Sequence, residues 1–100
     1  MKRKTKVDLR FAKVSEWIAA GNLASGYYLL ERLKRETEKA YGFTAKKWCP
    51  YSGWMKPSVC WLPKSQVQRV ENDFYTHGPA QMFVVPEWLY RAKGDEGYEL

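Results

Sequence analysis

The sequence predicts an α+β domain, with an N-terminal helical hairpin followed by a small antiparallel β-sheet and a short C-terminal helix. Apolar residues recur at helical spacing within residues 8–42, apolar and polar positions alternate after Ser58, and Pro86 is well placed to open a last helix. The length of 100 residues suits a single domain. The expected parts are a basic arm, one domain and an acidic, mobile tail, at residues 1–7, 8–94 and 95–100.

Two helices are predicted within residues 8–42. Asp8 can cap the first helix, which is expected to end near Gly21. Spacings of four, three and four residues mark one apolar face of it, at Val7, Phe11, Val14 and Ile18. The second helix is predicted from about Leu23 to Tyr41. It carries opposite charges four positions apart, Glu31 with Arg35 and Arg32 with Glu36. The short connection predicts that the two helices pack antiparallel.

Residues 43–57 are predicted to form an irregular loop rich in aromatic residues. Prolines and glycines interrupt both the helical and the strand period, although a short strand is expected near Thr44–Trp48. X-Pro bonds in such a loop exchange slowly between cis and trans. A host prolyl isomerase could therefore dock at Pro50 and Pro57, and rigid turn prolines are the alternative.

A first strand is predicted within residues 58–70. Its side chains alternate between two faces, with Cys60 and Leu62 on one and Val59 and Trp61 on the other. Pro63 places this strand at a sheet edge or ends it. Where the strand resumes, Val67 and Val70 are expected to point inward.

A second strand and a short helix complete the predicted domain. The strand covers residues 80–85, and turn residues lie between it and the first strand. Pro86 is expected as the first helical residue, with Glu87 in the first turn, where the helix dipole favours an acid. Gly94 is the predicted stop.

The net charge of +6 is concentrated in the first half of the chain. Residues 1–50 contain 12 Lys/Arg and 5 Asp/Glu, a net +7, whereas residues 51–100 contain 5 and 6, a net −1. A basic half of this kind is a candidate surface for phosphate or for an acidic protein face, and a solvated helix face is the alternative. The 5 Trp, 7 Tyr and 4 Phe exceed what a small core needs, so some are expected at an interface.

The chain shows no signal peptide and no apolar run long enough to span a membrane. A cytoplasmic location without membrane contact is therefore expected. In that compartment Cys49 and Cys60 are expected to remain thiols, with Cys60 in the core.

Catalysis and metal binding are not predicted. His77 stands beside Gly78-Pro79 in a predicted turn, and a nucleophilic pair of Cys49 or Cys60 with His77 lacks a third, orienting residue. These side chains also fall short of the four ligands of structural zinc, at a spacing that matches no zinc knuckle. The sequence has neither a glycine-rich phosphate loop nor an acidic cluster suited to Mg²⁺. We therefore expect a non-enzyme without a cofactor.

One region mixes cations with flat rings and is the predicted partner-binding site. Its members are Lys46, Lys47, Trp48, Tyr51, Trp54 and Met55, to which the predicted second helix adds Arg32, Lys34 and Arg35. Single-stranded nucleic acid binds such surfaces, at about 1–3 kcal/mol for each stacked base. Protein hot spots use the same residue types. A third interpretation places Trp48 and Trp54 in the core.

Two segments resemble small phage proteins. Val59-Cys60-Trp61-Leu62-Pro63-Lys64-Ser65-Gln66-Val67 is similar to their WLPKSQV strand, and Val84 to Leu89 with Lys93-Gly94 is similar to their closing VPEWL…KG segment. Such proteins tend to be encoded beside phage recombination genes. In size, charge and additional helices the chain is most similar to the anti-RecBCD accessory proteins of lambdoid phages. The resemblance covers about residues 58–94 and implies binding to the RecC subunit of the host helicase–nuclease.

These features together predict a phage-type accessory protein. It is expected to bind and modulate or inhibit a host DNA-repair helicase–nuclease, RecBCD by the resemblance, in favour of phage recombination. The alternative function, from a different class, is direct binding of single-stranded nucleic acid.

Overall fold

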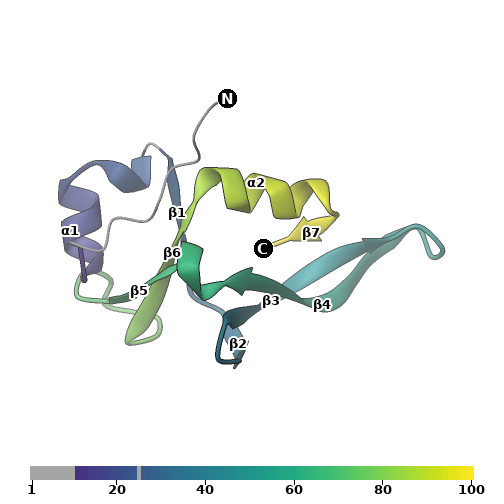
Figure 1. The fold of residues 1–100 in the computed structure, drawn as a ribbon, viewed down its shortest axis with the longest axis horizontal. Coiled ribbons are helices and arrows are strands. Elements are labelled where there is room, and N and C mark those ends of the chain that lie inside the picture. Colours follow the sequence, from purple (N-terminus) through teal and green to yellow (C-terminus); the bar gives the residue numbers. More distant parts are fainter. Residues whose placement is uncertain (1–10, 25) are drawn as a thin grey trace.

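The computed structural model describes residues 11–24 and 26–100, and the fold is mostly β (Figure 1). Its elements in chain order are α1 (Val14–Ala19), the 3₁₀ turn η1 (Asn22–Ala24), β1 (Tyr27–Leu30), β2 (Leu33–Glu36), β3 (Ala40–Cys49), β4 (Trp54–Pro63), the 3₁₀ turn η2 (Lys64–Gln66), β5 (Gln68–Glu71), β6 (Gln81–Pro86), α2 (Glu87–Asp95) and β7 (Tyr98–Glu99). The predicted α+β fold class is therefore wrong, because the fold is mostly β with two sheets and strands replace most of the N-terminal helical hairpin.

Two antiparallel sheets form the fold. The first has the strand order β1-β6-β5, and the second has the order β2-β3-β4. The short strand β7 pairs with β3 on the edge that β2 also uses, opposite Lys46 and Lys47. In the second sheet β4 is an edge strand that ends at Pro63, as the sequence predicts for a strand that meets a proline.

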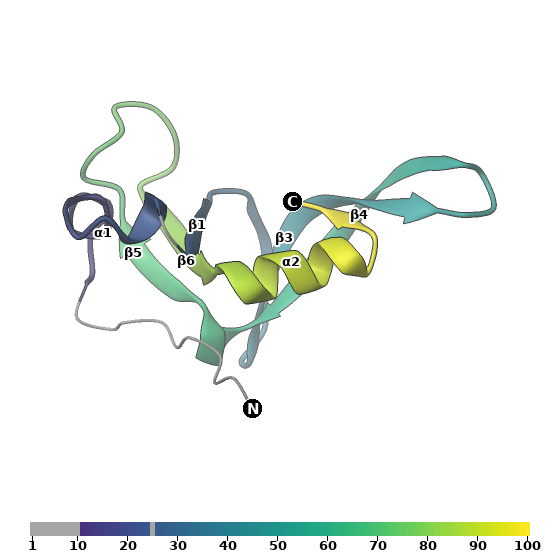
Figure 2. The ribbon, with the colours of Figure 1, turned by 90° about the horizontal axis from the view of Figure 1, so that it is seen from above.

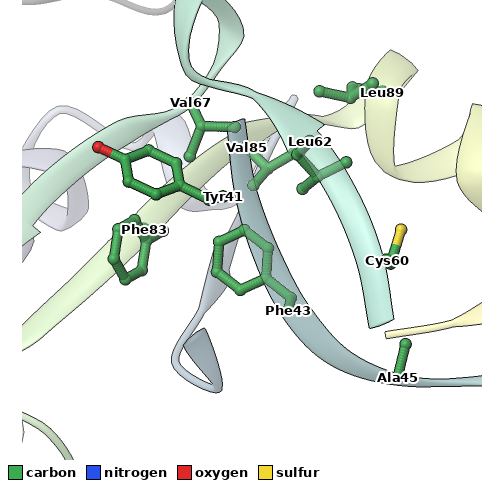
Figure 3. Close-up of a cluster of buried hydrophobic side chains, with 9 residues drawn as sticks. All are labelled: Tyr41, Phe43, Ala45, Cys60, Leu62, Val67, Phe83, Val85 and Leu89. Carbon is green, nitrogen blue, oxygen red and sulfur yellow. The ribbon is translucent and has the colours of Figure 1, made fainter. Parts of the chain in front are cut away.

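Strand β6 is buried on both faces and divides the core into two clusters. Phe83 and Val85 enter a cluster with β3, β4 and α2 (Figure 3). Its buried members are Tyr41, Phe43, Ala45, Cys60, Leu62, Val67, Phe83, Val85 and Leu89. Met82 and Val84, on the other face, pack with Val14, Trp17 and Val70. The inward positions of Cys60, Leu62, Val67 and Val70 were predicted and are confirmed.

The predicted second helix from Leu23 to Tyr41 is wrong. Gly26 has a φ of 106°, which breaks a right-handed helix at its first turn. Residues 27–30 then pair with β6, and β2 pairs with β3. Glu36 binds Lys64 and Arg69 across the fold instead of Arg32. Long-range pairing therefore overrides the four-residue charge spacing.

The first helix is shorter than predicted. Within the described residues it covers Val14–Ala19, and Asp8, its predicted cap, lies outside them, as does the expected basic arm at 1–7. The backbone N–H and the hydroxyl of Ser15 donate hydrogen bonds to the Asp73 carboxylate, which ties the helix to the loop between β5 and β6. Trp17 of this helix is fully buried, and its ring packs edge-on against the Tyr27 ring, with 4.8 Å between the ring centroids.

Two further expectations need correction. The predicted loop at 43–57 is a β-hairpin, because β3 and β4 pair residue by residue from Ala40↔Pro63 to Cys49↔Trp54. The predicted mobile tail at 95–100 is ordered, because helix α2 continues to Asp95 and β7 then pairs with β3. The strand at 80–85 is confirmed as β6, and Pro86 is the N-cap of α2, one position before its predicted place.

We predict that Phe83→Ala lowers the free energy of unfolding by about 3–5 kcal/mol. The Phe83 ring is 3% exposed and meets the rings of Phe43 and Tyr41 at 5.2 and 4.8 Å, so its removal leaves a cavity between the two sheets. Urea denaturation measures the change. Tyr51→Ala is the control and should stay within about 0.5 kcal/mol of the wild type. Equal effects of the two substitutions would contradict the assigned core.

We also predict that Glu36 makes stability depend on pH in the acid range. The hydrogen bond from Lys64, with the charges of Lys64 and Arg69, lowers the pKa of the Glu36 carboxyl. A lowered folded pKa means that the stabilisation is present above the unfolded pKa, about 4.3, and is lost as pH falls through the folded pKa. Urea midpoints between about pH 5 and 3 should therefore fall less steeply in Glu36→Gln than in the wild type. Identical slopes would contradict the prediction.

Candidate functional site

The β3–β4 hairpin projects beyond the packed body of the molecule. We call residues 46–57, its outer half, the arm. Figures 1 and 2 show the arm extending away from the sheets, at the end opposite the loop that joins β5 to β6. Gly53 closes its turn with a φ of 75°, and the Gly53 N–H donates to the Cys49 carbonyl at 2.9 Å. Because glycine adopts this conformation without strain, the turn can be tight.

The hairpin has two different faces, because side chains alternate along each strand. The inner face begins in the core and continues onto the arm, through Tyr41, Phe43, Ala45, Lys47 and Cys49 of β3 and Leu62, Cys60, Ser58, Lys56 and Trp54 of β4. The outer face carries Gly42, Thr44, Lys46 and Trp48 of β3 and Trp61, Val59, Pro57 and Met55 of β4. Trp48 and Trp54 thus lie on opposite faces of one ribbon.

The rings of the arm are exposed. Tyr51, at the turn, is 99% exposed, Trp54 is 67% exposed and Trp48 is 49% exposed. Met55 is half-buried opposite Trp48. The interpretation that Trp48 and Trp54 are core residues is therefore wrong, and the arm presents flat apolar surface to solvent.

All charged side chains of the arm are lysines. Residues 40–63 contain Lys46, Lys47 and Lys56 and no Asp or Glu. Lys47 lies directly opposite Lys56 in the ladder, and like charges in that position destabilise a sheet. The Lys47 ammonium lies over the Tyr98 ring of β7, 4.8 Å from its centroid. Within the described part of the chain, none of these lysines forms an ion pair.

The three cations that were predicted on a helix lie on the second sheet instead. Arg32 precedes β2, and its carbonyl accepts from the Thr44 N–H at 2.9 Å. Arg35 is in register with Gly42, which places it on the outer face, whereas Lys34 falls where the β2–β3 register shifts. The structure therefore brings Arg32 and Arg35 beside the hairpin, through strand pairing rather than through helix geometry.

Trp61 was missed as a site residue. Its ring is 39% exposed on the outer face, directly across from Gly42. A glycine within a strand often marks a close approach of another group, but that signal needs Gly42 to be placed in a strand, whereas the sequence predicted a helix up to Tyr41. Pro57 likewise lies within β4 and not in a loop, which removes half of the predicted isomerase site, while Pro50 remains in the turn.

The two cysteines are free and differ in environment. Hydrogen bonds from Ser52 lower the pKa of the half-buried Cys49 thiol at the base of the turn. Burial raises the pKa of the Cys60 thiol, which packs in the core as predicted. Cys49 is therefore the more reactive of the two.

Candidate metal ligands do not cluster in the described part of the chain. Across residues 11–24 and 26–100, no three His, Cys, Asp or Glu side chains gather closely enough to hold a metal ion. His77 is exposed in the β5–β6 loop, beside the exposed ring pair Phe74 and Tyr75. None of the helices described in the structure has the length and apolar character needed to cross a membrane.

Comparison with known proteins adds no relative. Neither a protein-family model nor a curated protein or solved structure matches this chain.

We predict that Cys49 reacts with a thiol reagent in the native protein, whereas Cys60 reacts only after unfolding. The rate at Cys49 should rise with pH around a midpoint below the ordinary value for cysteine, about 8.5, because the thiolate is the reactive form. Ser52→Ala should move this midpoint upward. Alkylation followed by peptide mass analysis measures both rates, and an unchanged midpoint in Ser52→Ala would contradict the assigned hydrogen bonds.

Proposed function

We propose that this chain is a non-catalytic binding protein whose arm engages single-stranded nucleic acid. The observation that carries the proposal is the combination of exposed rings with lysines that have no acidic partner on one projecting ribbon. Bases stack on such rings whatever their sequence, while lysines follow the phosphates.

The charge distribution favours a polyanion as the ligand. Some cations elsewhere in the described chain have carboxylate partners, as in Lys64 and Arg69 with Glu36, and Arg91 with Glu87. On the arm, Lys46, Lys47 and Lys56 form no ion pair within the described residues, and only Lys46 has an acid opposite it in the ladder, Glu99 of β7. A phosphate backbone would offset the repulsion between the opposed Lys47 and Lys56, which folding alone leaves in place.

The rings of the arm are exposed and therefore available for stacking. Trp48 and Trp54 each keep about half or more of their surface free, and Tyr51 is held out by the turn. The ladder of β3 and β4 fixes the positions of both tryptophans, so a base would meet a platform that is already ordered.

We predict that the double substitution Trp48→Ala with Trp54→Ala weakens binding of a labelled oligothymidylate. Loss of one stacked base weakens binding by about 5- to 150-fold, and the double substitution should weaken it by at least this much. Fluorescence anisotropy at low salt measures the affinity. The matched control is Phe74→Ala with Tyr75→Ala, which removes two exposed rings at the other end of the molecule and should leave the affinity unchanged.

The salt dependence provides a second measurement of the same proposal. Replacing Lys46, Lys47 and Lys56 by glutamine should reduce the slope of log affinity against log salt by about 2, at about 0.7 for each phosphate contact on a single strand. A wild-type protein that fails to bind the oligonucleotide at low salt would overturn the proposal.

A second candidate function is docking of the arm on a host DNA-repair helicase–nuclease of the RecBCD class. The observation that favours it is the presence of rings on both faces of the arm, Trp48 outside and Trp54 inside, which suits insertion into a protein cleft. The resemblance to anti-RecBCD proteins supports the choice of partner. The test measures nuclease activity of the purified host complex with this chain and with the Trp48→Ala, Trp54→Ala variant. Inhibition by the wild type alone supports docking, and activity that neither protein changes contradicts it.

A further inference from the structure

We propose that the outer face of the β3–β4 hairpin, from Trp61 to Trp48, is a platform that extends the binding surface of the arm along a single nucleic-acid strand. This inference rests on the proposed function. It adds Trp61 as a further ring on which a base stacks, a row of cations for the phosphates, and an expected length for the bound strand.

The Trp61 ring has a fixed position at the base of the hairpin, where a base could stack on it. A Cβ atom at position 42 would come within 3.1 Å of two Trp61 ring atoms and within 2.8 Å of Val59 Cγ1. Only glycine lets the ring lie this close to the neighbouring strand. The ring therefore has the Gly42 backbone beneath it and keeps 39% of its surface exposed. Its position relative to Trp48 is set by the paired strands.

Cations lie beside this face along its whole length. Arg35 is in register with Gly42 at the Trp61 end, and Lys46 is two residues before Trp48 at the other end. Arg32 and Lys46 line one hollow, together with Thr44, Pro57 and the acidic Glu99. None of the three cations forms an ion pair within the described residues. Glu99, opposite Lys46 on β7, offsets one charge, so the face stays net positive.

The distance between Trp61 and Trp48 matches the length of a short single-stranded oligonucleotide. Gly42 and Trp48 are six residues apart along β3, which at about 3.4 Å a residue is about 20 Å. A stacked strand rises by about 3.4 Å per nucleotide, so about six nucleotides would reach from Trp61 to Trp48. A strand of about three nucleotides held at the tip would not reach Trp61.

An exposed ring pair in the β5–β6 loop does not suit the same ligand. Phe74 and Tyr75 meet edge to face at 5.0 Å in the β5–β6 loop. Glu71 and Asp73 stand next to them in the chain, and Glu31 shares a pocket with Tyr75. An acidic setting repels phosphate, so this pair serves as the control.

The test compares a long oligothymidylate of about ten nucleotides with a short one of about three, by fluorescence anisotropy at low salt. We expect Trp61→Ala to weaken binding of the long oligonucleotide by about 5- to 150-fold and to leave the short one unchanged. Phe74→Ala should bind both as the wild type does.

Arg35→Gln is the second variant, because Arg35 is exposed and its replacement leaves the core intact. For the long oligonucleotide it should lower the salt slope by about 0.7, with Arg91→Gln on α2 as the control. The platform is overturned if Trp61→Ala and Arg35→Gln both bind the long oligonucleotide as the wild type does, or if Trp61→Ala weakens both lengths equally. The proposed function would survive either outcome, since it fails when the wild type binds no oligonucleotide or when the Trp48→Ala, Trp54→Ala variant binds it as the wild type does.

Discussion

The packing of Phe83 against Phe43 and Tyr41 is the contact on which the rest of the structure depends. It joins the two sheets, because Phe83 belongs to β6 and both partners belong to β3. The buried cluster around this contact extends along the inner face of the hairpin only as far as Ala45 on β3 and Cys60 on β4. Beyond them the body offers no core, so the hairpin continues as a ribbon with both faces accessible. The shape of the arm thus follows from where the core ends.

The sequence allowed the second half of the fold to be predicted far better than the first. Alternating burial around Cys60 and Leu62 and the proline before α2 are local signals, and they were interpreted correctly. Residues 23–41 have a helical period and helical charge spacing, although they form strands. The interactions that decide between helix and strand, Glu36 with Lys64 and Arg69 and the β1–β6 pairing, join residues far apart in the chain. Single-sequence reasoning has no access to such partners.

The candidate site was predictable in its composition and not in its geometry. Surplus rings and lysines identified Trp48, Tyr51 and Trp54 as interface residues, and their exposure fits that interpretation. Their placement on two faces of one ribbon required the β3–β4 register. Trp61 was assigned to a strand face without a role, because its significance depends on Gly42 across the ladder. Residues 59–67 and 84–89 supply Leu62, Val67, Val85 and Leu89 to the core, so these segments build the scaffold rather than the arm.

The distribution of acidic residues is the strongest physical argument for a ligand on the arm. Elsewhere in the fold a carboxylate lies beside Lys64 and Arg69 and another beside Arg91, so ion pairs do form on the surface of this protein. The hairpin instead opposes Lys47 to Lys56 and leaves exposed rings around them, an arrangement that costs stability in water. A sequence that served folding alone would relieve this cost with one acidic substitution on either strand. The proposed anionic strand would relieve this cost on binding, because its phosphates neutralise the lysines while its bases cover the rings.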